Sequence, residues 1–270
     1  MIPFKAYRPS LSLRPYIKMY FFGGHDNIPP KIRRMVPYGE TALCIYKING
    51  VTYNGSAPHH LCLSGLTNTF QEITSGDGLI EVIVIHFTTL GAHLFFNTPL
   101  YELYGPVVEL DETGDVELTE LKDRLMEEST PGKYWALINE FFLKRLAQQD
   151  MNSKKFLLMN EAIVKIRRNK VYQVKDLGDQ LNISTRYLSQ LFRSYTGFSV
   201  KDMIRLDRFH TALNILKNNH KGIPLQQIAE ICRYHDLSHM SSDFIKIAGY
   251  NPTQTAEKSK EFNDSIGWRL

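Results

Sequence analysis

The chain has 270 residues, of which 43% are hydrophobic and 22% charged, and its formal net charge is +4. This length suits about two domains, and the hydrophobic content is ordinary for a globular core. The charge is uneven: residues 1–150 hold 13 Lys and Arg against 17 Asp and Glu, whereas residues 151–270 hold 19 against 11. A basic C-terminal half beside an acidic N-terminal half favours nucleic-acid binding by the former.

Secretion and membrane signals are not found in the sequence. The start, Met1 to Lys5, has no apolar core of signal-peptide length, and apolar stretches such as Val82 to Ile85 are too short to span a membrane. The cysteines are odd in number and lack CxxC spacing, which argues against a disulfide framework or a zinc site. Cys44 and Cys62 lie in strand-like runs and are expected to be buried. We expect a soluble cytoplasmic protein without membrane contact.

The N-terminal part is rich in short β-branched and aromatic runs, which are typical of strands. The predicted strands are Tyr16–Phe22, Thr41–Ile48, Leu61–Leu63, Thr67–Ile73 and Leu79–Phe87. Asn49-Gly50 and Asn54-Gly55 are hairpin-type turn signals. Strands at this spacing predict a small β-sandwich or barrel.

Three accessory helices are predicted after these strands, at residues 88–97, 115–128 and 133–147. Residues 109–128 hold nine acidic residues, but Leu118, Leu121 and Leu125 are spaced three and four apart, which indicates an amphipathic helix. The polar run at residues 150–153 is the predicted junction, and it gives a domain at residues 1–150 and another at residues 154–270.

The C-terminal part contains one helix-turn-helix pattern twice. Leu177, Leu188, Phe192, Gly197 and Ser199 recur as Ile228, Met240, Phe244, Gly249 and Asn251. The offset is 51 residues for the first pair and 52 for the others, so the second copy has one extra residue in its turn. Each copy is predicted as a short amphipathic helix, a turn, an N-cap residue (Ser184 or Asp236), a second helix and a terminal glycine.

A longer helix is predicted between the copies, with Ser199 as its cap and Asp202 at the capping-box position. Asn218, Asn219 and Gly222 end it. At about 20 residues it spans roughly 30 Å, close to the ~34 Å between successive major-groove segments on one face of DNA. Two units joined in this way are suited to two successive turns of one duplex.

Residues 160–258 resemble the DNA-binding region of the AraC/XylS transcriptional regulators. The matching residues are Leu177-Gly178, Ile183-Ser184, Leu188, Leu191-Phe192, Gly197, Arg208 to Ala212, Leu216, Ile228-Ala229-Glu230, Ser238-His239, Phe244, Gly249 and Pro252. The chain departs from the family pattern at Arg233-Tyr234, Met240, Asp243 and Thr255-Ala256. The resemblance implies an all-α domain with two helix-turn-helix units joined by a linker helix, which binds double-stranded promoter DNA.

The outward faces of the two second helices supply the candidate DNA contacts. In the first copy these are Thr185, Arg186, Ser189, Gln190 and Arg193. Arg pairs bidentately with guanine and Gln with adenine, and the resemblance places base-reading side chains at Arg186, Ser189 and Gln190. The candidates in the second copy are Ser238, His239, Ser241, Ser242 and Lys246. Because serines are short, the second copy is expected mainly to position the protein.

The N-terminal half resembles one branch of the same regulators through residues 36–40 and 87–110, which implies a cupin-like domain that binds an effector or dimerises. Candidates to line an effector pocket are Tyr38, Tyr46, Phe70 and Phe87, and plain core packing is the alternative. Cupin metal sites use an HxH pair followed by Glu, which is not the arrangement of His59, His60, His86 and His93. No metal site, cofactor or catalytic residue is predicted.

These observations predict an α+β protein with an N-terminal cupin-like β domain, accessory helices and a C-terminal all-α DNA-binding domain. The predicted function is a one-component transcriptional regulator with an effector-sensing N-terminal domain and no enzymatic activity. Its expected partners are promoter DNA, a small-molecule effector, RNA polymerase if it is an activator, and a second copy if it dimerises. Two alternatives stay open: a constitutive DNA-binding protein whose N-terminal domain only mediates assembly, and a cupin-type metal enzyme fused to a DNA-binding domain.

Overall fold

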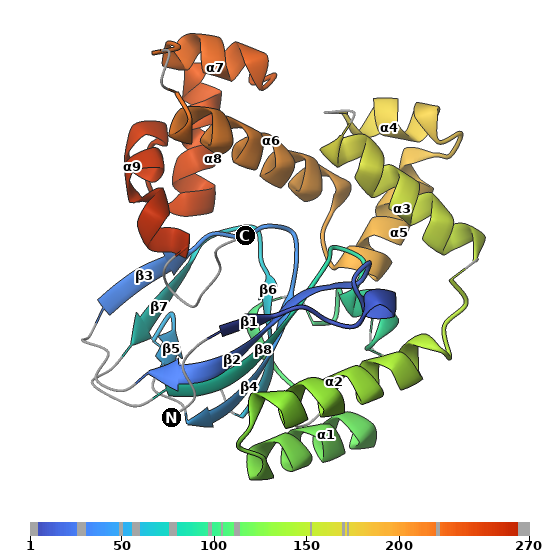
Figure 1. Ribbon diagram of the computed structural model, residues 1–270. Helices are drawn as coiled ribbons and strands as arrows, with labels where there is room; N and C mark the ends of the chain where they lie inside the picture. Colours follow the sequence, from blue (N-terminus) through green and yellow to red (C-terminus); the bar gives the residue numbers. More distant parts are fainter. Residues whose placement is uncertain are drawn as a thin grey trace.

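The computed structural model describes residues 5–25, 31–48, 51–55, 60–75, 80–96, 99–103, 105–110, 114–151, 153–168, 171, 173–219 and 222–263. The described strands lie between residues 5 and 109, and the described α-helices follow from residue 116 onward. Figure 1 shows the sheets below and the C-terminal helices above them. The chain is therefore an α+β protein.

Two antiparallel sheets form the N-terminal part. The larger has the strand order β1-β2-β8-β4-β6-β9, and the smaller has the order β3-β7-β5. The larger sheet consists of β1 (Lys5–Tyr7), β2 (Ile17–His25), β8 (Ile80–Phe87), β4 (Ala42–Ile48), β6 (Leu61–Leu66) and β9 (Gly105–Glu109). The smaller consists of β3 (Lys31–Met35), β7 (Gln71–Ser75) and β5 (Val51–Tyr53). The sequence predicts a small β-sandwich or barrel, and the structure has two sheets, although the strand expected at residues 67–73 begins only at Gln71.

Successive side chains of a strand point to opposite faces of a sheet, and in the larger sheet both faces are buried. Phe21 and Val84 on one face share a core with Ile73 of the smaller sheet. Phe22 and Ile85 on the other face belong to the main core of the molecule. The pairing of β4 with β6 places Cys44 opposite Cys62, and both are buried, as the sequence predicts.

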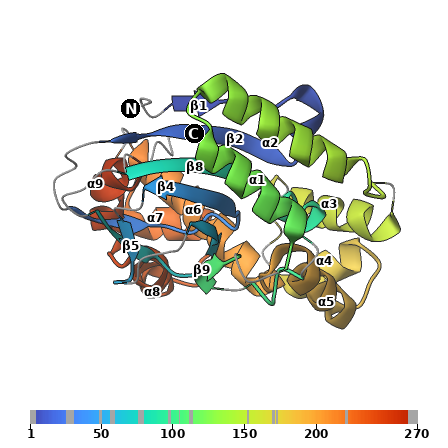
Figure 2. The same ribbon diagram turned by 90° about the horizontal axis from the view of Figure 1, so that it is seen from below.

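Two accessory helices cover the second face of the larger sheet (Figure 2). They are α1 (Val116–Glu127) and α2 (Pro131–Leu146), close to the ranges expected from the sequence. Phe142 of α2 packs edge-on against Phe87 of β8, with ring centroids 5.6 Å apart. The accessory helices thus complete the hydrophobic core of this half.

The helix predicted at residues 88–97 is not formed. Residues 88–96 make turns that contain a single 3-10 helix, η2 (Ala92–Leu94), and residue 97 lies outside the described part. The Thr88 amide donates to the Tyr16 carbonyl, at 2.8 Å, and the Thr88 hydroxyl donates to the Pro15 carbonyl. These bonds hold the segment against the loop before β2, so tertiary contacts override its local helical preference.

The C-terminal part is helical throughout its described length. Its helices are α3 (Lys154–Arg167), α4 (Val174–Gln180), α5 (Thr185–Thr196), α6 (Val200–Lys217), α7 (Leu225–Ile231), α8 (Leu237–Ala248) and α9 (Pro252–Asn263). Residues 181–184 connect α4 to α5 and residues 232–236 connect α7 to α8, so the second turn is one residue longer, as predicted. The two helix-turn-helix units lie at opposite ends of α6 (Figure 1).

The helix ends follow from the capping residues that the sequence places there. The Ser184 hydroxyl accepts from the Tyr187 amide at 3.2 Å, and the Asp236 carboxylate accepts from the His239 amide at 2.7 Å. Both helices then end at a glycine in the left-handed region, Gly197 (φ 74°) and Gly249 (φ 76°). The start and end of α5 and α8 are therefore set by sequence.

One hydrophobic core runs from the larger sheet into the helical part. Phe192 and Phe244, which occupy the same position in the two units, are both fully buried. Phe244 packs on Phe209 of α6, with ring centroids 4.6 Å apart. In the part of the chain that the structure describes, no helix is long and apolar enough to cross a membrane.

Candidate functional site

The first unit presents its predicted contact residues on an open surface of α5. Leu188, Leu191 and Phe192 form the buried side of this helix. The exposed residues are Thr185, Arg186, Gln190 and Arg193, whereas Ser189 is half-buried. The Ser189 hydroxyl donates to the Thr185 carbonyl, at 2.7 Å, so its proton is used within the helix. Arg186, Gln190 and Arg193, spaced four and three apart, are left as the long polar side chains of this face.

The predicted contact residues of the second unit fall on two different surfaces. One is a hollow on α8 lined by Leu237, Ser238, Ser241, Ser242, Ile245 and Lys246. His239 instead lines a groove between the two units, where its ring lies edge-on to Tyr234 with centroids 5.3 Å apart. The four predicted residues Ser238, Ser241, Ser242 and Lys246 are thus brought together, and His239 is separated from them.

Two residues of the α8 hollow were missed in the sequence analysis. Leu237 is half-buried and Ile245 is 55% exposed. The offset of 52 residues between the copies aligns them with Thr185 and Arg193, both of which were predicted as contacts. Applying the offset to every position of the face, rather than selecting polar residues, would have identified them.

The helix α6 sets the distance between the two exposed faces. It runs from Val200 to Lys217, 18 residues, which corresponds to about 27 Å at 1.5 Å per residue. The α5 and α8 helices pack against it near its two ends (Figure 1). The α6 helix itself is thus about 7 Å shorter than the ~34 Å helical repeat of DNA, and α5 and α8 lie at its two ends.

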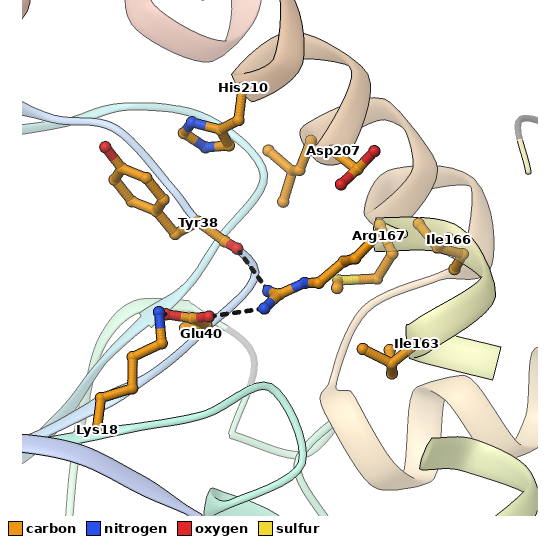
Figure 3. A pocket seen from close by; sticks show the side chains of 10 residues that line it. Lys18, Tyr38, Glu40, Ile163, Ile166, Arg167, Asp207 and His210 are labelled. Atoms are coloured by element: carbon orange, nitrogen blue, oxygen red, sulfur yellow. Dashed lines mark hydrogen bonds and ion pairs between the residues drawn. The ribbon is translucent and has the colours of Figure 1, made fainter. Parts of the chain in front are cut away.

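The α6 helix also forms one wall of a cavity between the sheets and the helical part (Figure 3). The cavity measures about 160 Å³ and is lined by Lys18, Tyr38, Glu40, Ile163, Ile166, Arg167, Met203, Leu206, Asp207 and His210. Of the four aromatic residues predicted to line an effector pocket, Tyr38 lies here. Tyr46 and Phe87 are buried core residues, and Phe70 packs elsewhere, on Arg34.

Glu40 connects the two parts of the chain at this cavity. One of its oxygens lies 2.7 Å from Nζ of Lys18, on β2, and the other lies 3.0 Å from Nη1 of Arg167, on α3. His86 Nε2 is 3.6 Å from the carboxylate. Burial alone would raise the pKa of Glu40, but Lys18, Arg167 and His86 outweigh it and hold this pKa below its usual value. Glu40 is therefore a buried, ionised link between sheet and helices.

Tyr38 and His210 form a second contact across the same boundary. Their rings stack with centroids 4.0 Å apart and an interplanar angle of 17°. His210 Nε2 lies 2.7 Å from the Pro37 carbonyl, so this nitrogen carries a proton and donates. Burial lowers the pKa of His210 to about 4, and burial likewise lowers the pKa of His86 to about 4. Both imidazoles are therefore neutral near pH 7.

The C-terminal ends of α5 and α8 both contact the β-rich part. Nη1 of Arg34, on β3, donates to the Gly249 carbonyl at 2.8 Å, and its guanidinium lies over the Tyr250 ring at 4.1 Å. At the other unit, His93 stacks on Tyr195 with ring centroids 3.9 Å apart. The N-terminal part thus holds both exposed helices as well as the linker between them.

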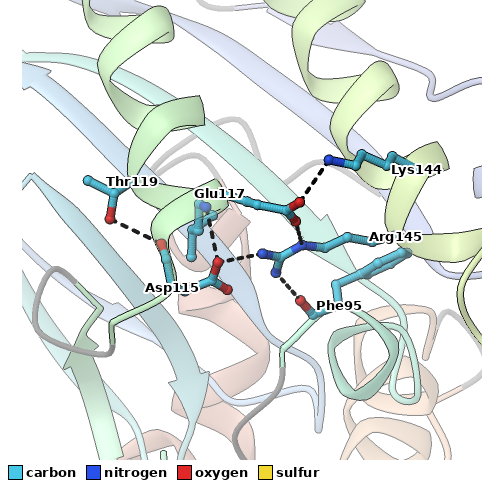
Figure 4. A network of polar contacts seen from close by, with 7 residues as sticks. Phe95, Asp115, Glu117, Thr119, Lys144 and Arg145 are labelled. Carbon is cyan, nitrogen blue, oxygen red and sulfur yellow. Dashed lines mark hydrogen bonds and ion pairs between the residues drawn. The ribbon is translucent and has the colours of Figure 1, made fainter.

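The accessory helices are tied to the segment that carries His93 (Figure 4). Arg145 of α2 donates to the Phe95 carbonyl and to Asp115, the N-cap residue of α1. Lys144 pairs with Glu117 of α1, at 2.8 Å. This network connects α1 and α2 to the turn that touches α5.

The histidines predicted as structural rather than metal-binding are dispersed. His86 lies beside Glu40, His93 on Tyr195, and His60 against the Tyr46 carbonyl at 2.7 Å, while His59 lies outside the described residues. Among the residues whose placement is given, no group of three His, Cys, Asp or Glu has the geometry to hold a metal ion.

Comparison with known families assigns both halves of the chain. Residues 177–258 match a helix-turn-helix domain family. Residues 5–109 match a family described as a domain of unknown function (DUF6597). The first match covers both helix-turn-helix units and α6, and the second covers both sheets.

The chain is also similar to individual known proteins. It is 26% identical to the Msm operon regulatory protein of Streptococcus mutans over 156 residues, which are 57% of this chain and 54% of that protein. The match thus spans about half the length of this curated relative. A structure of ToxT from Vibrio cholerae is similar with a TM-score of 0.43 and 14% identity, over 88% of this chain and 97% of that one. ToxT bound to (E)-4-(8-methylnaphthalen-1-yl)but-3-enoic acid gives a TM-score of 0.42 and 16% identity, over 87% and 97% of the two chains.

The sequence resemblance, the matched helix-turn-helix family and the paired units at the ends of one helix agree. Residues 177–258 therefore belong to this helix-turn-helix domain family, in agreement with the resemblance of the sequence to the AraC/XylS transcriptional regulators.

Proposed function

We propose that this protein is a sequence-specific transcriptional regulator that binds double-stranded promoter DNA through α5 and α8. The observation that carries the proposal is the pair of exposed helix faces at the two ends of α6, an 18-residue helix. The C-terminal half is also basic, with 19 Lys and Arg against 11 Asp and Glu in residues 151–270. Such an excess supports contact with phosphates.

The first unit is the main base reader in this proposal. Arg186 and Arg193 offer bidentate donors for guanine, and Gln190 offers the donor and acceptor pair that fits adenine. All three are exposed on α5. Thr185 and Ser189, together with Ser238, Ser241, Ser242 and Lys246 of α8, supply further contacts to bases or phosphates. His239 faces the groove between the units and is assigned to the DNA backbone there.

The N-terminal domain, residues 1–150, is the sensor in this proposal. A small effector in the cavity beside Glu40 would touch β-strand, α3 and α6 residues at once. By changing the links of Glu40 to Arg167 and of Tyr38 to His210, it would change how the sheets hold α6. An activator of this type would in addition contact RNA polymerase, and dimerisation through the N-terminal domain would pair two such binding units on one promoter.

DNA binding is tested by selecting ligands from a randomised duplex library with the full-length protein. We expect a preferred sequence, and we expect Arg186→Ala to relax the preference at one base pair. Arg124→Ala, at a side chain that is 56% exposed on α1, is the matched control and should leave the selected sequence unchanged. Recovery of no preferred sequence would contradict the proposal.

Effector binding is tested by screening small metabolites for a shift in the melting temperature of the full-length protein. Ile166→Trp would fill the cavity wall and should abolish the shift caused by a compound that binds there. If every compound leaves the melting temperature unchanged, the constitutive alternative is favoured. Stoichiometric bound metal in the purified protein would instead favour the metal-enzyme alternative.

A further inference from the structure

The two exposed helices differ in side-chain chemistry at most aligned positions of their outer faces, although Ser189 and Ser241 are the same. With the offset of 52 residues, Thr185, Arg186, Gln190 and Arg193 of α5 correspond to Leu237, Ser238, Ser242 and Ile245 of α8. The three long hydrogen-bonding side chains of the first unit, Arg186, Gln190 and Arg193, are thus replaced by two serines and an isoleucine in the second. No Arg, Asn or Gln occurs in the α8 sequence from Leu237 to Ala248.

Ile245 lies on the outer face of α8 although the helix has a buried side for its other aliphatic residues. Met240, Phe244 and Ile247 are fully buried, whereas Ile245 is 55% exposed. Ile245 and Leu237 line the same hollow as Ser238 and Ser242. The hollow therefore has an apolar character at both ends and hydroxyls between them.

The position of this hollow identifies its occupant. It is the counterpart, in the second unit, of the α5 face that carries Arg186 and Gln190, and Lys246 at its edge supplies a positive charge. A surface that occupies the same place in its unit as a DNA-binding face, and that carries a lysine at its edge, fits the major groove of a duplex. If the hollow instead binds a protein partner, DNA binding will be insensitive to the loss of every thymine methyl group in the experiment below.

In the major groove the C5 methyl group of thymine is the apolar feature that aliphatic side chains contact. We infer that α8 reads thymine methyl groups through Ile245 and Leu237, with Ser238 and Ser242 as short hydrogen-bonding neighbours. This inference rests on the proposed function, and it assigns thymine-bearing base pairs to the half-site of the second unit. The half-site of the first unit carries the guanine and adenine that Arg186 and Gln190 recognise.

The test uses the full-length protein and a duplex chosen by selection from a randomised library. Each thymine of this duplex is replaced singly by deoxyuridine, which lacks only the C5 methyl. We expect roughly a three- to five-fold loss of affinity at one or two positions of the second half-site, since one buried methyl is worth about that much. Uracil substitutions in the half-site bound by α5 should have a smaller effect.

The variant Ile245→Ser identifies the residue responsible. It should bind the thymine duplex as weakly as the unaltered protein binds the deoxyuridine duplex, and it should lose no further affinity when that methyl is removed. The matched control is Ile231→Ser on α7, because Ile231 is 50% exposed but lies outside the hollow. This control should keep the full sensitivity to deoxyuridine.

Three results would overturn the inference and each has a different meaning. Sequence-specific binding that is insensitive to every deoxyuridine replacement would leave the proposed function intact and refute methyl reading. Equal sensitivity in Ile245→Ser and the unaltered protein would refute the role of Ile245. A duplex library that yields no preferred sequence would refute the proposed function and the inference together.

Discussion

Asp243 of α8 forms an ion pair with Arg205 of α6, with 2.6 Å between Oδ1 and Nε. The Asp243 side chain is only 7% exposed and that of Arg205 is 19% exposed. Asp243 occupies the position of Leu191 in the first unit, so a salt bridge replaces an apolar contact between the second helix-turn-helix unit and the linker helix. The departure from the family pattern at this residue is thus compensated within the chain.

Removing one partner of this pair should destabilise the protein strongly. Arg205→Leu leaves the Asp243 carboxylate buried without its counter-charge, and we expect a loss of about 3 kcal/mol in the free energy of unfolding. The double variant Arg205→Leu/Asp243→Leu restores an apolar contact and should recover most of this loss. Urea unfolding of the two variants provides the comparison, and additive losses in the double variant would contradict the account.

The helical part shows why a repeated amphipathic pattern is informative. The spacing of Leu188, Leu191 and Phe192 determines which side of α5 is buried, and Ser184 with Gly197 determines where it starts and ends. These are local properties, so they are present in the sequence. The partner of Asp243 was not predictable in the same way, because Arg205 is 38 residues away and only the crossing of α6 with α8 brings the two together.

The buried aromatic residues of the two units provide a stability test. Phe192→Ala and Phe244→Ala each empty a fully buried site, and each should reduce the free energy of unfolding by ~3–5 kcal/mol. Leu157→Ala, at a residue that is 52% exposed on α3, should change it by less than about 0.5 kcal/mol. Equal effects of the buried and exposed substitutions in urea titrations would show that the helix register is wrong.

The pH dependence of stability should reflect the neutral histidines at the boundary between sheet and helices. The pKa of His86 and of His210 is about 4 in the folded protein, against about 6.5 for an unperturbed imidazole. The unfolded chain therefore binds more protons between these values, and the free energy of unfolding falls as pH drops from 6.5 to 4. Each histidine should contribute a slope of roughly 1 kcal/mol per pH unit.

The variant His210→Asn keeps a hydrogen-bond donor near the Pro37 carbonyl but cannot titrate. The slope of the free energy of unfolding against pH should therefore decrease by the contribution of one histidine. Glu40 acts in the same direction at lower pH, because its pKa is held below the usual value of a glutamate, about 4.5. Its contribution is complete above that value and is lost as pH falls through the folded pKa. Denaturant titrations across this pH window give the slopes, and an unchanged slope in His210→Asn would contradict burial of a neutral ring.

The N-terminal half was predictable in its strands but not in the site it builds. Runs of β-branched and aromatic residues predicted β4 and β8 closely, whereas the turns at residues 88–96 depend on contacts with Pro15 and Tyr16 far away in the sequence. Glu40 has no local signal for its role. Its partners Lys18 and Arg167 lie 22 and 127 residues away, so only the folded chain assembles the link.

Substitutions of base-contacting and phosphate-contacting residues should have different effects on DNA affinity. Arg186→Ala should cost ~1–3 kcal/mol on the selected site and relax the preference at one base pair. Lys246→Ala should weaken binding about equally on all sequences and reduce the salt slope by about 1, because a phosphate contact is lost. Binding isotherms over a range of salt concentrations distinguish the two, and identical behaviour of the variants would remove the assignment of Arg186 as a base reader.

The most direct test of the central claim is a hydroxyl-radical footprint of the full-length protein on its selected duplex. Two exposed helices at the ends of α6 should protect two successive segments on one face of the DNA, about 20 base pairs in all, without requiring a palindrome. Ser242→Glu, which places a negative charge in the α8 hollow, should remove protection from the second segment and leave the first. Protection of a single segment by the unaltered protein would contradict the account, because α8 would then not engage DNA.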